Sequence, residues 1–135
     1  MIIDAEIFSR LVLAAIAGGF IGFERKTVHK PAGLRTHMIV SMGAALFTII
    51  SVTVFIDIDP TRMLAAIVTG IGFLGAGTIF RAENQVKGLT TAASLWSVAA
   101  IGIAVGMGEY LLGIIATILV IIILQINKID FFREL

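Results

Sequence analysis

The chain has 135 residues, a length that allows one domain, and its composition excludes an ordinary soluble protein. Hydrophobic residues make up 59% and charged residues 14%, and the mean hydropathy is +1.06, whereas roughly a quarter of a soluble domain is charged. The net charge is +1 and there is no cysteine, which excludes disulfides, thiolate metal sites and thiol nucleophiles.

Five apolar runs follow one another along the chain. They cover residues 7–23, 38–56, 63–80, 90–107 and 110–126. Roughly 20 helical residues cross a bilayer core of about 30 Å, and backbone amides in hydrocarbon must be paired. Because no strand-like alternation of polar and apolar residues is present, we expect an all-α fold. The prediction is a polytopic membrane bundle of five transmembrane helices, forming a single transmembrane domain over residues 1–135.

Arg10 is a charged residue inside the first apolar run. It lies about two turns into the helix if that helix begins near Asp4, and Glu6 stands four residues before it. One interpretation is an ion pair with Glu6, with the long side chain reaching the membrane surface. The other is a functional role, because charge within a membrane helix is costly.

The connection between the first two runs, residues 24–37, is the most polar part of the chain. Glu24 and Arg25 directly follow the first run, and Arg35, Thr36 and His37 directly precede the second. Both groups therefore lie at the membrane boundary and are able to meet. We expect a Glu24–Arg35 ion pair that clamps the two helix ends, with a ligand or partner site as the alternative.

Helix boundary signals occur at two further connections. Asp59 suits the N-cap of the third helix and Pro60 its first position, where a missing N–H costs nothing. Residues 106–109, Gly-Met-Gly-Glu, predict a tight reversal between the fourth and fifth helices.

The third run contains four glycines in the spacing of a dinucleotide-binding loop: Gly70, Gly72, Gly75 and Gly77. That motif requires a preceding strand and a helix start that faces water, and neither is expected within an apolar span. Packing between helices explains the glycines better, since small residues let membrane helices approach closely. A helix that is broken near the midplane, exposing backbone to ions, is the alternative.

Small residues at spacings of four recur in other helices. Gly18 with Gly22 and Gly102 with Gly106 predict close helix contacts, as do Ala66 with Gly70 and Gly72 with Ala76 in the third helix. These faces describe a tightly packed bundle in the lipid bilayer. They also leave surface for a second subunit, so we expect a homo-oligomer, most simply a dimer, or another membrane protein as partner.

The last polar segment, residues 81–91, precedes the fourth helix, which Thr90 and Thr91 are expected to cap. His29 and His37 lie in one connection without a nucleophile or carboxylate pair, so we expect no enzyme, catalytic residue or cofactor. Nucleic acid is not an expected partner. A magnesium cage of carboxylates is hard to build, because no Asp or Glu lies in the middle of the predicted spans, and any metal site stays unknown.

The basic residues predict the orientation. Eight of the ten lysines and arginines fall on one side of the predicted bundle, and only Arg10 and Arg62 fall on the other. The positive-inside rule places the first set in the cytoplasm, with the N-terminus outside and the C-terminus inside. The expected location is the inner or plasma membrane of a prokaryote. The eight are Arg25, Lys26, Lys30, Arg35, Arg81, Lys87, Lys128 and Arg133.

Four sequence blocks together resemble the MgtC/SapB family of prokaryotic inner-membrane proteins. They are residues 22–25 (GFER), 32–37 (AGLRTH), 70–77 (GIGFLGAG) and 88–96 (GLTTAASLW), and the likeness extends from Arg10 to Tyr110. Many family members continue into a cytoplasmic ACT-like domain, whereas this chain resembles their transmembrane domain only. The positions that match the family motifs are Glu24, Arg25, Arg35, Thr36, Gly70, Gly72, Gly75, Gly77, Arg81, Asn84, Gly88, Thr90, Thr91 and Trp96.

The resemblance implies a membrane protein linked to magnesium homeostasis and, in pathogens, to virulence. Some family members are described as restraining the F-type ATP synthase. Two functions therefore remain open for this chain. One is a regulator that acts through membrane contacts with itself or with another complex. The other is a small ion transporter or channel, with a pathway past the glycines of the third helix towards Arg35 and Asn84.

Overall fold

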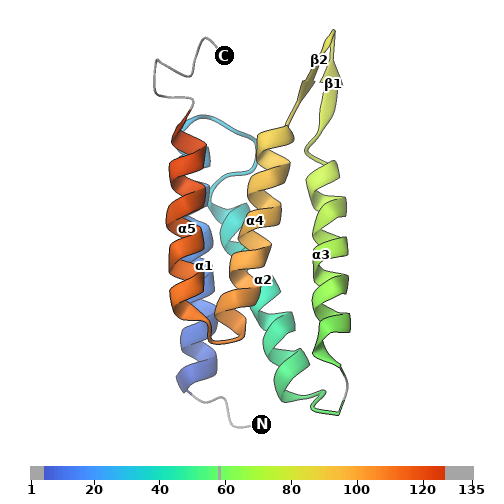
Figure 1. The fold of residues 1–135 in the computed structure, drawn as a ribbon. Coiled ribbons are helices and arrows are strands. Elements are labelled where there is room, and N and C mark those ends of the chain that lie inside the picture. The colour runs from blue at the N-terminus through green and yellow to red at the C-terminus, as the bar shows by residue number, and fades with distance from the viewer. Residues whose placement is uncertain (1–4, 58, 127–135) are drawn as a thin grey trace.

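The computed structural model describes residues 5–57 and 59–126, which form five helices and one β-hairpin (Figure 1). The predicted helix start near Asp4, and the basic residues Lys128 and Arg133, lie outside the described residues. The elements are α1 (Ala5–Thr27), α2 (Leu34–Thr53), α3 (Pro60–Ala76), β1 (Phe80–Ala82), β2 (Gln85–Lys87), α4 (Leu89–Gly106) and α5 (Tyr110–Gln125).

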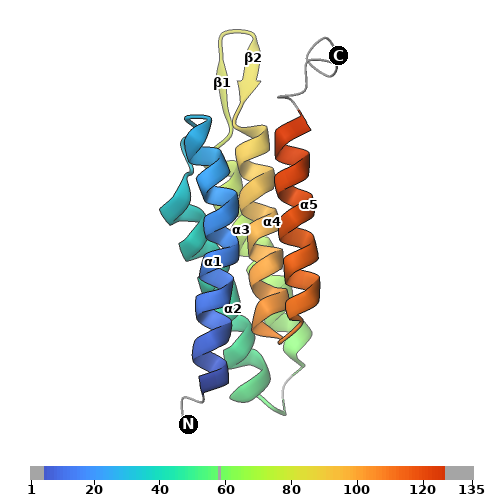
Figure 2. The same cartoon turned by 90° about the vertical axis from the view of Figure 1, so that its left-hand side faces the viewer.

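The helices run alongside one another as a bundle, which confirms the predicted all-α fold (Figures 1 and 2). Helix α2 packs against α1 and α4, and α5 packs against α4 and α1. Helix α3 stands at the edge of the bundle and contacts α4 and α2. The central position of α2 and α4 buries several of their polar side chains, among them His37, Ser41 and Ser94.

Four helices, α1 to α4, are long and apolar enough to cross a membrane, so the chain is a multi-pass membrane protein. Helix α5 is apolar but has 16 residues, which is about 24 Å at 1.5 Å per residue. That length falls short of a hydrocarbon core of about 30 Å. A fifth membrane crossing therefore stays a prediction.

Both predicted boundary signals are confirmed. The Asp59 carboxylate accepts a hydrogen bond of 2.9 Å from the amide of Thr61, and Pro60 occupies the first helical position of α3. The reversal between α4 and α5 uses Gly108 at a φ of +88°, and the amide of Tyr110 donates to the Gly108 carbonyl at 2.9 Å.

The predicted end of the third helix at Phe80 is wrong, because α3 ends at Ala76. The Thr78 hydroxyl donates to the Gly75 carbonyl at 2.8 Å, and the chain then turns into strand β1. Strands β1 and β2 pair antiparallel, with Arg81 opposite Val86. Runs of three residues carry too little alternation to be recognised in a sequence, so the hairpin was not predicted.

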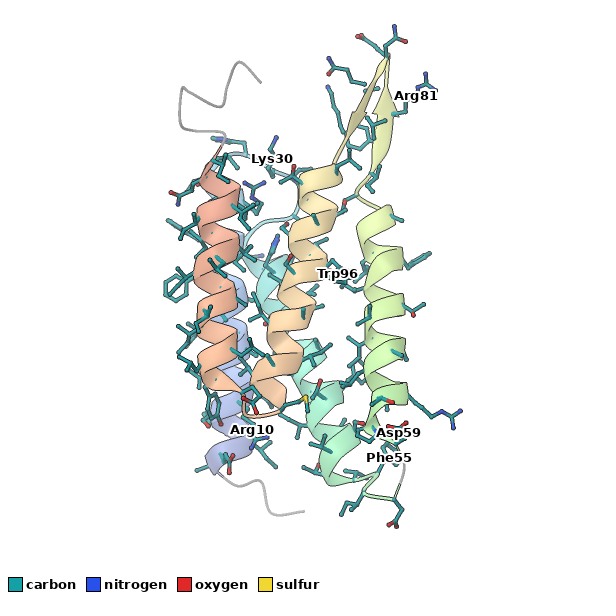
Figure 3. The ribbon with its side chains drawn as sticks, in the orientation of Figure 1. Arg10, Lys30, Phe55, Asp59, Arg81 and Trp96 are labelled. Atoms are coloured by element: carbon teal, nitrogen blue, oxygen red, sulfur yellow. The ribbon has the colours of Figure 1, made fainter. Side chains whose placement is uncertain are left out.

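The hairpin projects from one end of the bundle, which we call the hairpin end (Figure 1). Lys30 and Arg81 lie at this end, whereas Arg10 and Asp59 lie at the opposite end (Figure 3). The fold therefore sorts these labelled residues as the positive-inside argument requires. The assignment of the hairpin end to the cytoplasm stays a prediction.

Glycines bring the central helices into backbone contact, as the spacing predicts. A Cβ atom on Gly18 would lie 2.4 Å from the His37 carbonyl oxygen, and one on Gly22 would lie 2.8 Å from the Gly33 oxygen. On the other side of α2, a Cβ on Gly102 would lie 2.1 Å from the Ser41 carbonyl oxygen. Helix α2 is thus held between α1 and α4 at distances that exclude any side chain at these glycines.

Candidate functional site

A buried ion pair lies near the hairpin end of α1. Glu24 is 6% exposed and Arg25 is 4% exposed. The Nε and Nη2 atoms of Arg25 each donate to Glu24 Oε2, at 2.6 Å in both cases. The buried Arg25 guanidinium depends on this contact, because removal of the Glu24 carboxylate would take away the charge that compensates it.

The predicted ion pair between Glu24 and Arg35 is wrong. Arg35 and Thr36 are exposed at the start of α2, and Glu24 forms its ion pair with the adjacent Arg25. The physical reason is the close approach of the two helices, since Gly22 packs against the backbone of Gly33 and Leu34 at the start of α2. Arg35 then points away from the contact between the helices.

His37 is the polar centre of the interior and is fully buried. Its Nδ1 atom lies 2.9 Å from the Gly33 carbonyl oxygen, and its Nε2 atom lies 3.0 Å from Ser94 Oγ on α4. Because a carbonyl only accepts, Nδ1 carries a proton. The Ser94 hydroxyl donates to the Thr91 carbonyl oxygen at 2.8 Å, and its oxygen lies within hydrogen-bonding distance of Nε2.

Arg10 links α1 to α4 at the opposite end of the bundle. It forms an ion pair with Glu6, as predicted, and its Nη1 atom donates to the Gly106 carbonyl at 2.9 Å. The guanidinium thus satisfies a carbonyl at the C-terminus of α4, where the helix dipole favours a cation. The side chain is 19% exposed, so it connects two helices and does not simply extend to the surface.

The glycines of α3 divide into two groups. Helix α3 is continuous from Pro60 to Ala76, so the break near the midplane, which was the alternative to helix packing, is not present. Gly75 packs against Ala92 of α4, with a contact of 3.5 Å for an added Cβ. At Gly70 and Gly72, in contrast, an added Cβ would meet nothing within 4 Å. These two glycines have no packing partner in the described part of the chain.

Two apolar grooves flank α3. The first, of about 400 Å³, lies between α3 and α2, and its lining includes Gly43, Ala66 and Gly70. The second, of about 300 Å³, lies between α3 and α4, and its lining includes Gly72 and Trp96. Trp96 is half exposed on the side of α4 that faces α3 (Figure 3).

The remaining predicted residues lie at the hairpin end. Arg81 and Asn84 are exposed on the hairpin, and Gly77 is exposed just beyond α3. The N-cap of α4 is Gly88, with a φ of +92°, and neither Thr90 nor Thr91 caps the helix as expected. A Cβ on Gly88 would lie 1.8 Å from the Thr78 carbonyl oxygen, so only glycine fits where the hairpin rejoins the bundle.

Comparison with known proteins gives a family for this arrangement. Residues 11–129 match the model of the MgtC family. The chain belongs to the MgtC family. It is 47% identical over 130 residues to "Putative magnesium transporter YhiD" of Escherichia coli K12, covering 90% of this chain and 60% of that protein. It is 50% identical over 108 residues to "Protein MgtC" of Brucella abortus strain 2308, covering 80% of this chain and 45% of that protein.

This MgtC-family chain therefore spans about half the length of the curated relatives it matches. No solved structure matches it. Within residues 5–57 and 59–126, no three His, Cys, Asp or Glu side chains come together in a group that could hold a metal ion.

Two residues of this MgtC-family site were not predicted to contact each other. His37 and Ser94 were both within the quoted motifs, but the sequence gives no sign that they meet across α2 and α4. The only signal for this contact was the position of the two residues. Each lies a few residues after the polar segment at the start of its helix, the second helix for His37 and the fourth for Ser94. A polar residue at that depth requires a partner.

Proposed function

We propose that this protein is a membrane regulator linked to magnesium homeostasis, which acts by binding another membrane helix in the groove between α2 and α3. The magnesium link rests on the resemblance and on the name of the YhiD relative. The expected location is a prokaryotic inner membrane. The helix that binds belongs to a second copy of the chain or to another membrane complex, and the F-type ATP synthase is the candidate that the resemblance offers.

The open glycines of α3 carry this proposal. A glycine inside a helix lowers helix stability by about 1 kcal/mol relative to alanine. At Gly18, Gly22 and Gly102 that cost is offset by contacts between helices within the chain. Gly70 has no such contact, and neither has Gly43, which lines the same groove on α2. Small residues on both walls of a membrane groove suit the close approach of a further helix.

Substitution of Gly70 by leucine tests the function. A Cβ at position 70 meets nothing within 4 Å, and the rest of the leucine side chain would fill the groove of about 400 Å³. We expect the Gly70→Leu variant to reach the membrane in normal amounts and to lose its ability to restore growth in low magnesium to a host without its own family member. The matched control is Leu119→Trp, which enlarges an exposed residue on α5. Full growth with Gly70→Leu would refute the proposal.

A transporter is the second candidate, which the name of the YhiD relative favours. The continuous α3 offers no unwound backbone for ion coordination at the midplane, which favours the regulator. Purified protein in liposomes distinguishes the two functions. Magnesium flux above that of empty liposomes would support the transporter, and the regulator predicts none.

A further inference from the structure

A cavity of about 540 Å³ lies at the hairpin end, separate from the two grooves beside α3. The α1–α2 connection, the hairpin and the first turn of α4 line it, and its size is in the range of small-ligand sites. Its lining includes three basic side chains, His29, Lys30 and Lys87, and no acidic residue from the described part of the chain. Lys30 lies at this end of the bundle in Figure 3. The electrostatics of the cavity therefore favour an anion.

The N-terminus of α4 opens into the same cavity. Its N-cap residue is Gly88, which has no side chain to accept hydrogen bonds from the first amides of the helix. The amide of Ala92 donates to the Gly88 carbonyl at 2.9 Å, which is the first hydrogen bond of the helix. The amides before Ala92 therefore have no intrahelical acceptor. Glycine is required here by the close approach of the Thr78 carbonyl. The positive end of an 18-residue helix is thus left open towards the cavity.

Thr91 supplies an independent observation. The residue is 2% exposed and lines the cavity, yet its hydroxyl makes no hydrogen bond within the described residues. Its carbonyl is occupied, because it accepts from the Ser94 hydroxyl. The Thr91 hydroxyl oxygen is not one of the side-chain atoms that are both sealed from water and without a partner, so it stays open to the cavity. A hydroxyl that lines a basic cavity without a partner is placed to donate to a bound acceptor.

We propose that this cavity binds a phosphate group. A phosphate has three strong acceptor oxygens, and the cavity offers the matching donors: the ammonium groups of Lys30 and Lys87, the open amides of α4 and the Thr91 hydroxyl. The phosphate belongs either to the headgroup of an anionic phospholipid or to a soluble molecule. A site of this kind differs from general attraction between basic loops and lipid, because general attraction does not depend on a buried neutral hydroxyl.

Native mass spectrometry of the purified full chain tests the site. The chain is titrated in detergent with phosphatidylglycerol, with phosphatidylcholine and, separately, with inorganic phosphate. The test variants are Thr91→Val, which keeps the side-chain shape, and the double variant Lys30→Gln with Lys87→Gln. The control is Lys26→Gln, which removes an exposed charge at the same end that does not line the cavity. Circular dichroism and the unfolding midpoint establish that each variant is folded.

We expect saturable binding that Thr91→Val and the double lysine variant each weaken about tenfold or more, the scale of a lost hydrogen bond to a charged group. Lys26→Gln should stay within about twofold of the parent, since an exposed charge contributes little. Binding of phosphatidylglycerol alone identifies a lipid headgroup, and binding of inorganic phosphate identifies a soluble ligand. If neither phosphatidylglycerol nor inorganic phosphate binds, the site is refuted. The site is also refuted if Lys26→Gln weakens binding as much as Thr91→Val.

Discussion

His37 on α2 and Ser94 on α4 join the two central helices through a contact of 3.0 Å between Nε2 and Oγ, in an interior where both residues are almost fully buried. Replacement of Ser94 by alanine leaves the imidazole without this partner. We expect Ser94→Ala to lower the free energy of unfolding by about 1 to 3 kcal/mol, the cost of a buried polar group that loses its hydrogen bond.

The matched control is Ser97→Ala on the same helix, where the hydroxyl donates to the Ala93 carbonyl of its own helix. Its loss should change the unfolding free energy by no more than about 0.5 kcal/mol. Unfolding of both variants in mixed micelles gives the comparison. Equal effects of the two substitutions would show that the link between α2 and α4 contributes nothing.

Gly102 and Gly43 allow one substitution to be compared in two environments. A Cβ at Gly102 would lie 2.1 Å from the Ser41 carbonyl oxygen, so alanine must push α4 away from α2. We expect Gly102→Ala to destabilise the purified chain by about 1 to 3 kcal/mol or more. Gly43→Ala meets open space and should stabilise α2 by about 1 kcal/mol. Opposite shifts of the unfolding midpoint are the test, and a shift in the same direction would contradict the contact geometry.

The buried pair of Glu24 and Arg25 is expected to respond asymmetrically to substitution. Glu24→Gln leaves the Arg25 charge in the interior, at a cost of about 3 to 5 kcal/mol. The double variant Glu24→Gln with Arg25→Met removes both charges and should recover most of that loss. Unfolding measurements on Glu24→Gln and on the double variant give this comparison. A double variant that is less stable than the single one would rule out charge compensation as the reason for the pair.

Asp59 gives a pH dependence outside the membrane-spanning segments. Hydrogen bonds from the Thr61 hydroxyl and amide lower the pKa of this carboxyl below its usual 3.8. A lowered folded-state pKa gives a contribution to stability that is present above pH 3.8 and is lost as the pH falls through the folded-state pKa. An NMR titration of the Asp59 carboxyl should give a midpoint below 3.8, and Thr61→Ala should raise that midpoint. A midpoint that Thr61→Ala leaves unchanged would contradict the cap.

Local features of the fold were predictable because their causes lie within a few residues. Asp59 and Pro60 start α3 through their own chemistry, and the Gly18–Gly22 spacing indicates a helix contact without naming its partner. The ion pair of Arg10 with Glu6 was likewise a local expectation, since the two residues are one helical turn apart.

Contacts between separate helices were not predictable, because they depend on how each helix is rotated about its axis. The glycine contacts of α1, α2 and α4 determine that rotation, which buries His37 beside Ser94 and leaves Arg35 outside. The same limit explains why Glu24 was assigned to Arg35 and not to its neighbour. For the same reason, the sequence does not indicate which glycines of α3 pack against another helix of the chain and which do not.

The central claim is that the groove beside Gly70 receives a further membrane helix, and site-specific photocrosslinking in native membranes tests it most directly. A photoreactive side chain replaces Leu74, an exposed residue of the same groove, and a control replaces Leu119 on the exposed face of α5. We expect a discrete adduct, either a dimer or one defined partner, from position 74 and none from position 119. Only lipid adducts at position 74, or the same protein adducts at both positions, would contradict the account.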